Sequence, residues 1–188
     1  MVRLLRADAR RNRDALLTAA TAALVGGEPD IGVEEIARRA GVAVGTLYRH
    51  FDTREALVEE VFRQDLDDLC APAGDGDLHA FLIRLVRYST TSKGMAAALE
   101  AVMATASPVF DEARRRMEET LDELLVRGVA AGTVRADVTG RTVLRALGGV
   151  CSPHAVEVES LHIAELLYDG LRYRAATSNG THSEQERP

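Results

Sequence analysis

Hydrophobic residues recur at intervals of three and four along most of the chain, and polar or charged residues fill the positions between them. This spacing is typical of amphipathic α-helices, because it places the apolar side chains on one face of each helix. The sequence lacks the apolar and polar alternation that is typical of β-strands. The pattern therefore predicts an all-α fold of about nine helices.

Four helices are expected in the first seventy residues. They cover Ala9–Val25, Val33–Ala40, Val44–Phe51 and Thr53–Cys70. Gly41 lies between the two short helices, at the position where a left-handed glycine commonly ends a helix. Asp52 is expected to cap the fourth helix, with Glu55 three residues later as in a capping box. The chain is thus expected to form two short helices joined by a tight turn and held between two longer ones.

A boundary follows at residues 72–76, which hold one proline and two glycines. Beyond it, five periodic segments are expected to form helices, at residues 78–86, 95–106, 110–128, 143–151 and 158–171. We expect Gly94 to end the first of these helices. Glu112 and Arg116 lie four residues apart in the third one and are expected to form an ion pair along it.

Charge is distributed unevenly over the three expected parts of the chain. These parts are a domain at residues 1–54, a second domain at residues 55–176 and a polar, disordered tail at residues 177–188. The net charge of −6 argues against a general binder of polyanions. However, residues 1–51 hold eight arginines and six acidic residues, for a net +2, so the remainder carries −8. A nucleic-acid contact is therefore expected only from the N-terminal part.

The sequence gives little support to secretion. Arginines followed by the uncharged run Ala15–Gly27 are similar to the start of a signal peptide, but Thr18 and Thr21 interrupt the run, which is too short to span a bilayer. Cys70 and Cys151 lie far apart in the sequence, so neither a disulfide framework nor a zinc cluster is indicated. We expect a cytoplasmic protein without membrane segments.

The sequence likewise gives little support to catalysis. Cys151 with His154 offers a thiol near an imidazole, and His154, Glu157, Glu159 and His162 are conceivable metal ligands. Neither spacing matches a recognised site. We therefore expect no catalytic residue, no metal site and no cofactor.

The second short helix carries the chemistry that suits the major groove of DNA. Its outward face is expected to present Val44, Thr46, Tyr48, Arg49 and His50. These side chains offer methyl groups, hydroxyls and cationic donors, which are the groups that read base edges and hold phosphates.

The segment from Gly41 to Phe51, followed by Thr53–Leu57, resembles the helix-turn-helix of the TetR family of bacterial transcriptional regulators. The resemblance runs from Arg10 to Phe62 and rests on a glycine turn, a Tyr-x-His-Phe motif and a basic residue at fixed spacing. It implies that eight residues contact DNA. Those nearest base edges are Ala43, Val44, Gly45 and Thr46, and those beside them or at phosphates are Tyr48, Arg49, His50 and Arg54.

Two departures from the family pattern matter. Gly32 stands where a Ser or Thr often caps the first short helix, so that hydroxyl is missing. Ala43 and Val44 replace a more polar pair, which favours contact with thymine methyl groups at that point. In addition, Arg3, Arg6, Arg10 and Arg11 are expected to form a basic arm that reaches the DNA backbone or the minor groove.

The resemblance further implies a homodimer on a palindromic operator in double-stranded DNA, most often a repressor that a small-molecule effector releases. The expected dimer interface consists of Val143, Leu147, Val150, Leu161, Ala164, Tyr168 and Leu171. The expected effector pocket consists of Phe62, Phe81, Leu85, Tyr88, Met95, Met103, Phe110, Met117 and Leu121, with Thr91 as a further polar group. The alternatives are a regulator that activates or takes no ligand, and a helical enzyme or protein-interaction module whose first helices only resemble a DNA-binding unit.

Overall fold

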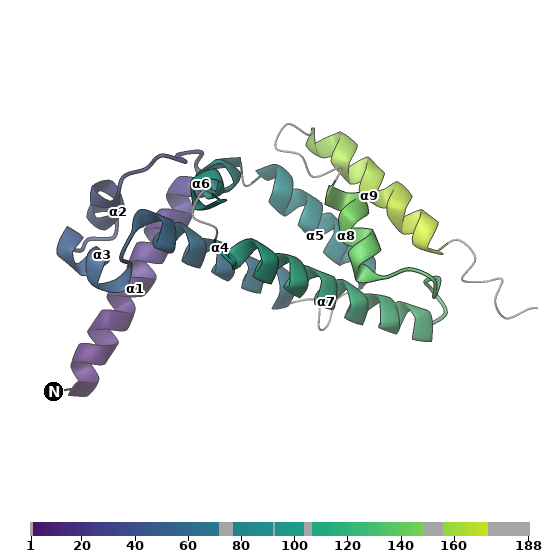
Figure 1. Ribbon diagram of the computed structural model, residues 1–188, viewed down its shortest axis with the longest axis horizontal. Coiled ribbons are helices and arrows are strands. Elements are labelled where there is room, and N and C mark those ends of the chain that lie inside the picture. Colours follow the sequence, from purple (N-terminus) through teal and green to yellow (C-terminus); the bar gives the residue numbers. More distant parts are fainter. Residues whose placement is uncertain (1, 72–76, 92, 104–106, 149–155, 173–188) are drawn as a thin grey trace, which may run out of the picture.

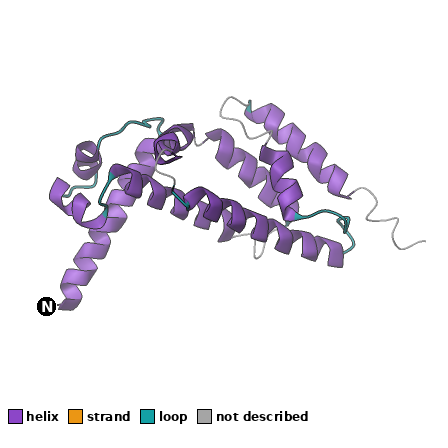
Figure 2. Ribbon diagram, viewed as in Figure 1, coloured by secondary structure: helices purple, strands orange, loops and turns teal. Residues whose placement is uncertain are grey.

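The computed structural model describes residues 2–71, 77–91, 93–103, 107–148 and 156–172, and these residues form nine α-helices and no strand (Figure 2). The all-α prediction is confirmed. The helices are α1 (Val2–Val25), α2 (Val33–Arg39), α3 (Val44–His50), α4 (Arg54–Cys70), α5 (Leu78–Thr91), α6 (Lys93–Met103), α7 (Val109–Ala130), α8 (Gly140–Gly148) and α9 (Glu157–Arg172). The expected tail lies outside the described residues.

The helices form an elongated molecule (Figure 1). Helices α1 to α3, which we call the N-terminal unit, lie at one end, and α8 and α9 lie at the other. The long helices α4 and α7 run between the two ends. Helix α4 contacts α1 on one side and α7 on the other, so it joins the two parts of the molecule.

Helix α1 begins seven residues earlier than the sequence pattern predicts. Arg3 and Arg6 therefore lie on the same helix as Arg10 and Arg11, and the expected contact of this basic arm with DNA stays a prediction. Arginine, leucine and alanine are strong helix formers, and they continue the helix although this stretch has little apolar periodicity. Further along, α1 buries Leu16 and Leu24 in the core of the N-terminal unit.

The turn between α2 and α3 forms as the sequence predicts. Gly41 has a φ of 69°, in the left-handed region that glycine adopts without strain. The amide of Gly41 donates to the carbonyl of Arg38 at 3.2 Å, and that of Val42 donates to the carbonyl of Ala37 at 3.0 Å. These two bonds form a Schellman motif, which closes α2 and turns the chain into α3. No side chain caps α2 at Gly32, as expected.

Helix α4 is capped by Thr53, so the expectation that Asp52 caps it is wrong. The side-chain oxygen of Thr53 accepts a hydrogen bond from the amide of Ala56 at 3.1 Å. Thr53 has extended backbone geometry and stands directly before the first helical residue, which are the requirements of an N-cap. The cap defines where α4 begins.

Gly94 lies inside α6, where the sequence pattern placed the end of the preceding helix. A Cβ atom at this position would lie 2.0 Å from the carbonyl oxygen of Leu24 and 3.2 Å from the Cα of Gly27. Helix α6 therefore crosses the end of α1 backbone against backbone, and only glycine fits there. This crossing ties the second half of the chain to the N-terminal unit.

A glycine also allows close contact between helices at the other end of the molecule. A Cβ at Gly140 would lie 2.4 Å from the carbonyl oxygen of Glu118, so α8 begins directly on α7. Asp122 on α7 accepts a hydrogen bond from the amide of Gly140 at 2.6 Å and caps α8 from the neighbouring helix. Helix α9 packs on α5, where the rings of His79 and Tyr168 lie 4.7 Å apart.

Candidate nucleic-acid interface

Helix α3 is held in the N-terminal unit by one side of its surface. Leu47 is completely buried, and Phe51 directly after the helix is 5% exposed. The guanidinium of Arg13 on α1 lies 5.5 Å from the centre of the Phe51 ring, as in a cation–π contact. These contacts leave the opposite side of α3 without cover.

The uncovered side of α3 carries the residues that the sequence singled out. Ala43, Gly45, Tyr48 and Arg49 are exposed, and Val44, Thr46 and His50 are half-buried. Tyr48 exposes 49% of its surface, which is unusual for an aromatic residue on a short helix. Four of the eight predicted DNA contacts are therefore exposed on or directly before α3, and three more are partly exposed.

The arginines of α2 are occupied by carboxylates of the same unit. Arg38 donates two hydrogen bonds of 2.6 Å to Glu35, and Arg39 bonds to both Glu35 and Glu28 at 2.8 Å. The bonds from Arg38 and then Arg39 hold the pKa of Glu35 at about 2. Arg49, in contrast, makes no ion pair with any residue that the structure describes. Of the arginines on α2 and α3, Arg49 is therefore the one without a carboxylate partner among the described residues.

Arg54 differs from the other predicted contacts. Its Nε donates to the carbonyl of Ile31 at 3.0 Å, and a second nitrogen donates to the carbonyl of Pro29. Arg54 is half-buried and fastens the connection between α1 and α2 to the start of α4. Its predicted contact with a phosphate stays a prediction, and it has only its remaining donors for that contact.

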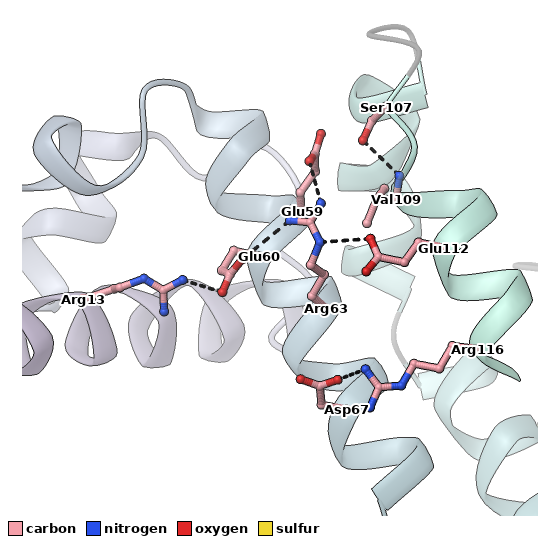
Figure 3. A network of polar contacts seen from close by, with 9 residues as sticks. All are labelled: Arg13, Glu59, Glu60, Arg63, Asp67, Ser107, Val109, Glu112 and Arg116. Carbon is pink, nitrogen blue, oxygen red and sulfur yellow. Dashed lines mark hydrogen bonds and ion pairs between the residues drawn. The ribbon is translucent and has the colours of Figure 1, made fainter. Parts of the chain in front are cut away.

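Ion pairs connect the N-terminal unit to α4 and α7 (Figure 3). Arg13 on α1 pairs with Glu60 on α4. Arg63 on α4 lies 3.6 Å from Glu60 and 3.4 Å from Glu112 on α7, and Arg116 on α7 pairs with Asp67. The expected pair between Glu112 and Arg116 is therefore wrong, because α4 offers both residues partners across the helix interface.

A cleft of about 560 Å³ opens between α4, α7 and α8, and we call it the α7/α8 cleft. It is lined by Phe62, Phe110, Ala113, Arg114, Met117, Glu118, Arg141, Leu144, Arg145 and Gly148. Three of the nine residues expected to form an effector pocket, Phe62, Phe110 and Met117, are among them. The volume falls within the range of sites for small molecules.

Most of the other residues expected in the pocket lie elsewhere. Phe81 and Leu121 are fully buried, and Met95 and Leu85 are nearly so, because they fill the core between the helices. Apolar periodicity identifies such residues as inward-facing but does not separate a packed core from the wall of a cavity. The side chain of Met103 lies outside the described residues.

The two polar groups expected in the pocket have partners within the chain. The hydroxyl of Tyr88 donates to a carboxylate oxygen of Asp65 on α4 at 3.3 Å, and Thr91 bonds to the carbonyl of Arg87 on its own helix. Burial, followed by the charge of Asp65, raises the pKa of the Tyr88 hydroxyl. Burial is also the largest cause that raises the pKa of Asp65. Tyr88 thus joins α5 to α4 and does not line the α7/α8 cleft.

The arginines and Leu144 of the cleft were missed in the sequence. Arg141 and Arg145 lie four residues apart on α8 with Leu144 between them, so they share one helix face. This spacing was the available signal. It was overlooked because the apolar residues on the opposite face of the same helix, Val143 and Leu147, dominate the hydrophobic pattern.

The residues expected at the dimer interface are occupied within the chain. Val143, Leu147, Ala164 and Leu171 are at most 3% exposed, and Leu161 and Tyr168 are half-buried. A buried side chain has no surface left for a second copy, so this part of the prediction is corrected. Val150 lies outside the described residues. The large apolar residues that α9 does expose are Val158, Ile163 and Leu166, with exposed fractions of 75%, 44% and 56%.

Helices α2 and α3 pack on each other across a tight turn, and the polar surface of α3 is uncovered at one end of the molecule. This arrangement defines a helix-turn-helix DNA-binding protein. Two families match the sequence. Residues 16–61 match the family described as bacterial regulatory proteins of the tetR family, and residues 73–173 match the SbtR-like C-terminal domain of transcriptional regulators. The chain therefore belongs to the TetR family of bacterial transcriptional regulators, as the resemblance of its first helices predicted.

Solved structures show the same fold over nearly the whole chain. A TetR transcriptional regulator of Streptomyces coelicolor, SCO0520, is 34% identical, covers 85% of this chain with 98% of its own, and gives a TM-score of 0.68. A TetR regulatory protein of Mycobacterium vanbaalenii is also 34% identical, with coverage of 89% and 99% and a TM-score of 0.67.

Two curated proteins are similar as well. The HTH-type transcriptional regulator AqdR of Rhodococcus erythropolis is 29% identical over 149 residues, which are 74% of this chain and 72% of that protein. The HTH-type transcriptional repressor KstR2 of Rhodococcus jostii is 51% identical over 37 residues, which are 20% of this chain and 18% of that protein.

Two properties of the described residues bear on other functions. No helix among them is both long and apolar enough to cross a membrane. No cluster of three or more His, Cys, Asp or Glu side chains in the same residues has the arrangement of a metal site. Cys151 and His154 lie outside the described residues.

Proposed function

We propose that this regulator is a homodimeric repressor that binds a palindromic operator through α3 and is released when a small-molecule effector binds the α7/α8 cleft. The repressor role is in line with the name of the similar Rhodococcus jostii protein. The effector role is supported by a cleft of small-molecule size on α7, the helix that the ion pairs join to α4.

In the proposed complex, Ala43 to Thr46 approach base edges, and Tyr48, Arg49 and His50 hold the phosphates that flank them. Base contacts then determine the sequence that is bound, and phosphate contacts determine position and affinity. Two recognition helices of a dimer must lie about 34–36 Å apart to enter successive major grooves. The proposed interface between copies is the exposed apolar surface of α9, near Ile163 and Leu166.

One observation carries the proposal: a single helix, α4, contacts the N-terminal unit and also lines the cleft. Its first turn holds Arg54 against the N-terminal unit, and Phe62, two turns further on, lines the cleft. A tilt of α4 therefore changes the position of α3 and the shape of the cleft together. An effector shifts this equilibrium only if it binds the conformation that does not fit DNA more tightly.

Selection of bound DNA from a random pool tests the first half of the proposal. We expect a palindromic sequence, and an affinity that falls steeply with salt concentration because bound phosphates release counterions. Thr46→Ala should change the selected sequence, whereas Arg49→Ala should weaken binding to all sequences alike. Recovery of random sequence, or the same effect from both variants, would contradict these roles.

Thermodynamic linkage between effector binding and DNA binding tests the second half of the proposal. A compound that binds the cleft and releases DNA must raise the melting temperature of the free protein and lower its affinity for the selected operator. Operator DNA must in turn weaken binding of the compound by the same factor. A compound that stabilises the protein without any effect on DNA affinity would overturn the proposed release mechanism.

A further inference from the structure

The α7/α8 cleft is formed by one face of α7 and one face of α8, together with Phe62 of α4. On α7, Phe110, Met117 and Glu118 follow one another at helical spacing, and α8 presents Arg141, Leu144 and Arg145 in the same way. The floor is apolar, with the rings of Phe62 and Phe110 6.2 Å apart and tilted by 39°. The floor therefore suits an apolar body of modest size, aliphatic or aromatic.

Charge in the cleft runs against the charge of the rest of the molecule. Residues 52–188 carry −8, yet the lining holds three arginines and a single acidic residue. That residue, Glu118, is mostly buried and lies 3.8 Å from Arg141. Arg114 and Arg145 make no ion pair or hydrogen bond with any part of the chain that the structure describes. Both are exposed, one on α7 and one on α8.

The neighbours of Arg114 on α7 differ from it, because they form ion pairs. Arg115 and Arg116 follow Arg114 directly on α7, and both have carboxylate partners, Glu119 and Asp67. Only the arginine that turns toward the cleft is left without one in this run of three. Arginine binds carboxylates and phosphates through a rigid fork of donors, and two such forks across a cleft suit one anionic group.

We infer that the α7/α8 cleft binds an amphipathic anion, whose carboxylate or phosphate group lies between Arg114 and Arg145 and whose apolar body lies on Phe62, Phe110 and Met117. The inference rests on the proposed function in one respect, since it names the chemical class of the effector for that same cleft. It also stands as a statement about binding alone, which is measured without DNA.

Paired probes test the charge requirement on the full chain. Decanoate and 2-naphthoate are compared with decanol and 2-naphthalenemethanol, which have similar apolar bodies but no charge, and acetate supplies the charge without a body. Isothermal titration should show at least one carboxylate binding about tenfold more tightly than its alcohol, the size of a charge-assisted hydrogen bond. Acetate should show no saturable binding. Equal affinity of each acid and its alcohol would overturn the inference.

Variants locate the site. Arg114→Gln with Arg145→Gln should weaken binding of the carboxylate about tenfold and leave the alcohol unchanged. Arg115→Gln with Arg87→Gln removes the same charge from exposed positions outside the cleft and should change neither affinity. Equal losses in both double variants would mean a general effect of charge and would overturn the site.

The two hypotheses fail in different measurements. Arginine-dependent binding of a carboxylate that leaves operator affinity unchanged would support the anion site and overturn its role as the effector site. Release of operator DNA by the uncharged alcohols, unaffected by Arg114→Gln with Arg145→Gln, would support effector release and overturn the anion site. Decyl phosphate is compared with decanoate to distinguish the two anionic groups. The compound that binds more tightly identifies whether the cleft prefers a phosphate or a carboxylate.

Discussion

At the scale of single residues, Gly45 on α3 is a glycine that the fold itself does not require. A Cβ atom built at Gly45 meets no atom within 4 Å, and the residue has no positive φ. The fold therefore gives no reason for glycine here, in contrast to Gly41 with its φ of 69°. An approaching DNA surface supplies a reason, because a missing side chain lets backbone and bases come close.

Gly45→Ala should therefore separate stability from DNA binding. Alanine favours a helix by roughly 0.5–1 kcal/mol over glycine, so the free energy of unfolding should stay the same or rise by that amount. Operator affinity should fall by about 1–3 kcal/mol, the range for a disturbed base contact. Urea unfolding and a fluorescence binding assay measure the two quantities. Unchanged operator affinity would remove Gly45 from the interface.

Asp65 and Tyr88 show a second residue-scale effect, in which burial acts against a charge. Because burial raises the pKa of Asp65 above its ordinary value of 3.8, the folded state binds its proton more tightly than the unfolded state does. The contribution of this group to stability is therefore fully present below pH 3.8 and is lost as the pH rises through the folded-state pKa.

Asp65→Asn should thus raise the melting temperature by a few degrees at pH 7, and the gain should shrink as the pH falls toward 4. Asparagine keeps an acceptor for the Tyr88 hydroxyl, so the hydrogen bond is retained. Thermal unfolding between pH 4 and pH 8 measures the difference. Tyr88→Phe serves as the control and should lower the melting temperature at pH 7, because it leaves the half-buried carboxylate of Asp65 without its donor. A gain in Asp65→Asn that does not depend on pH would contradict this account.

At the scale of helices, α6 crosses α1 with their backbones in close contact. Leu24 and Gly27 contribute backbone atoms, so neither can move aside as the end of a flexible side chain can. Gly94→Ala should lower the free energy of unfolding by about 1–3 kcal/mol, as overpacking does. Denaturant unfolding measures the loss, and Gly45→Ala is the matched control, since its new methyl group meets no atom. Equal stability of the two variants would contradict the close crossing.

The helices show where the sequence pattern is sufficient and where it is not. Apolar periodicity predicted all nine helices, because helical faces are set by residues three and four positions apart. It placed Gly94 between helices, since close backbone contact leaves no hydrophobic signal. It assigned Val143 and Ala164 to a second copy, because periodicity indicates an inward face but not the neighbour that covers it. The paired arginines of the α7/α8 cleft depend on tertiary contacts such as Arg116 with Asp67, which no local pattern contains.

At the scale of the whole molecule, net charge is distributed unevenly between the two ends of the elongated fold. The N-terminal unit has a net positive charge and lies at one end, and the acidic remainder extends away from it (Figure 1). In the proposed complex, a phosphate backbone at α3 meets Arg49 and repels the acidic remainder of the molecule. Nonspecific binding is then limited to what the N-terminal unit alone supplies, which favours the specific site.

The proposed dimer places a second copy at the opposite end, and α9 supplies its test. Ile163 and Leu166 are exposed at spacing that puts them on one side of the helix, where a symmetry-related α9 would cover them. Leu166→Glu should convert the dimer to a monomer in light scattering over a range of concentrations, since it sets two carboxylates against each other in an apolar contact. The variant should keep its helical content and lose operator affinity by more than tenfold, because one N-terminal unit reaches only one half-site. Val126→Glu, at a position on α7 that is 68% exposed, should leave both measurements unchanged. A Leu166→Glu protein that remains dimeric would place the contact between copies on another surface.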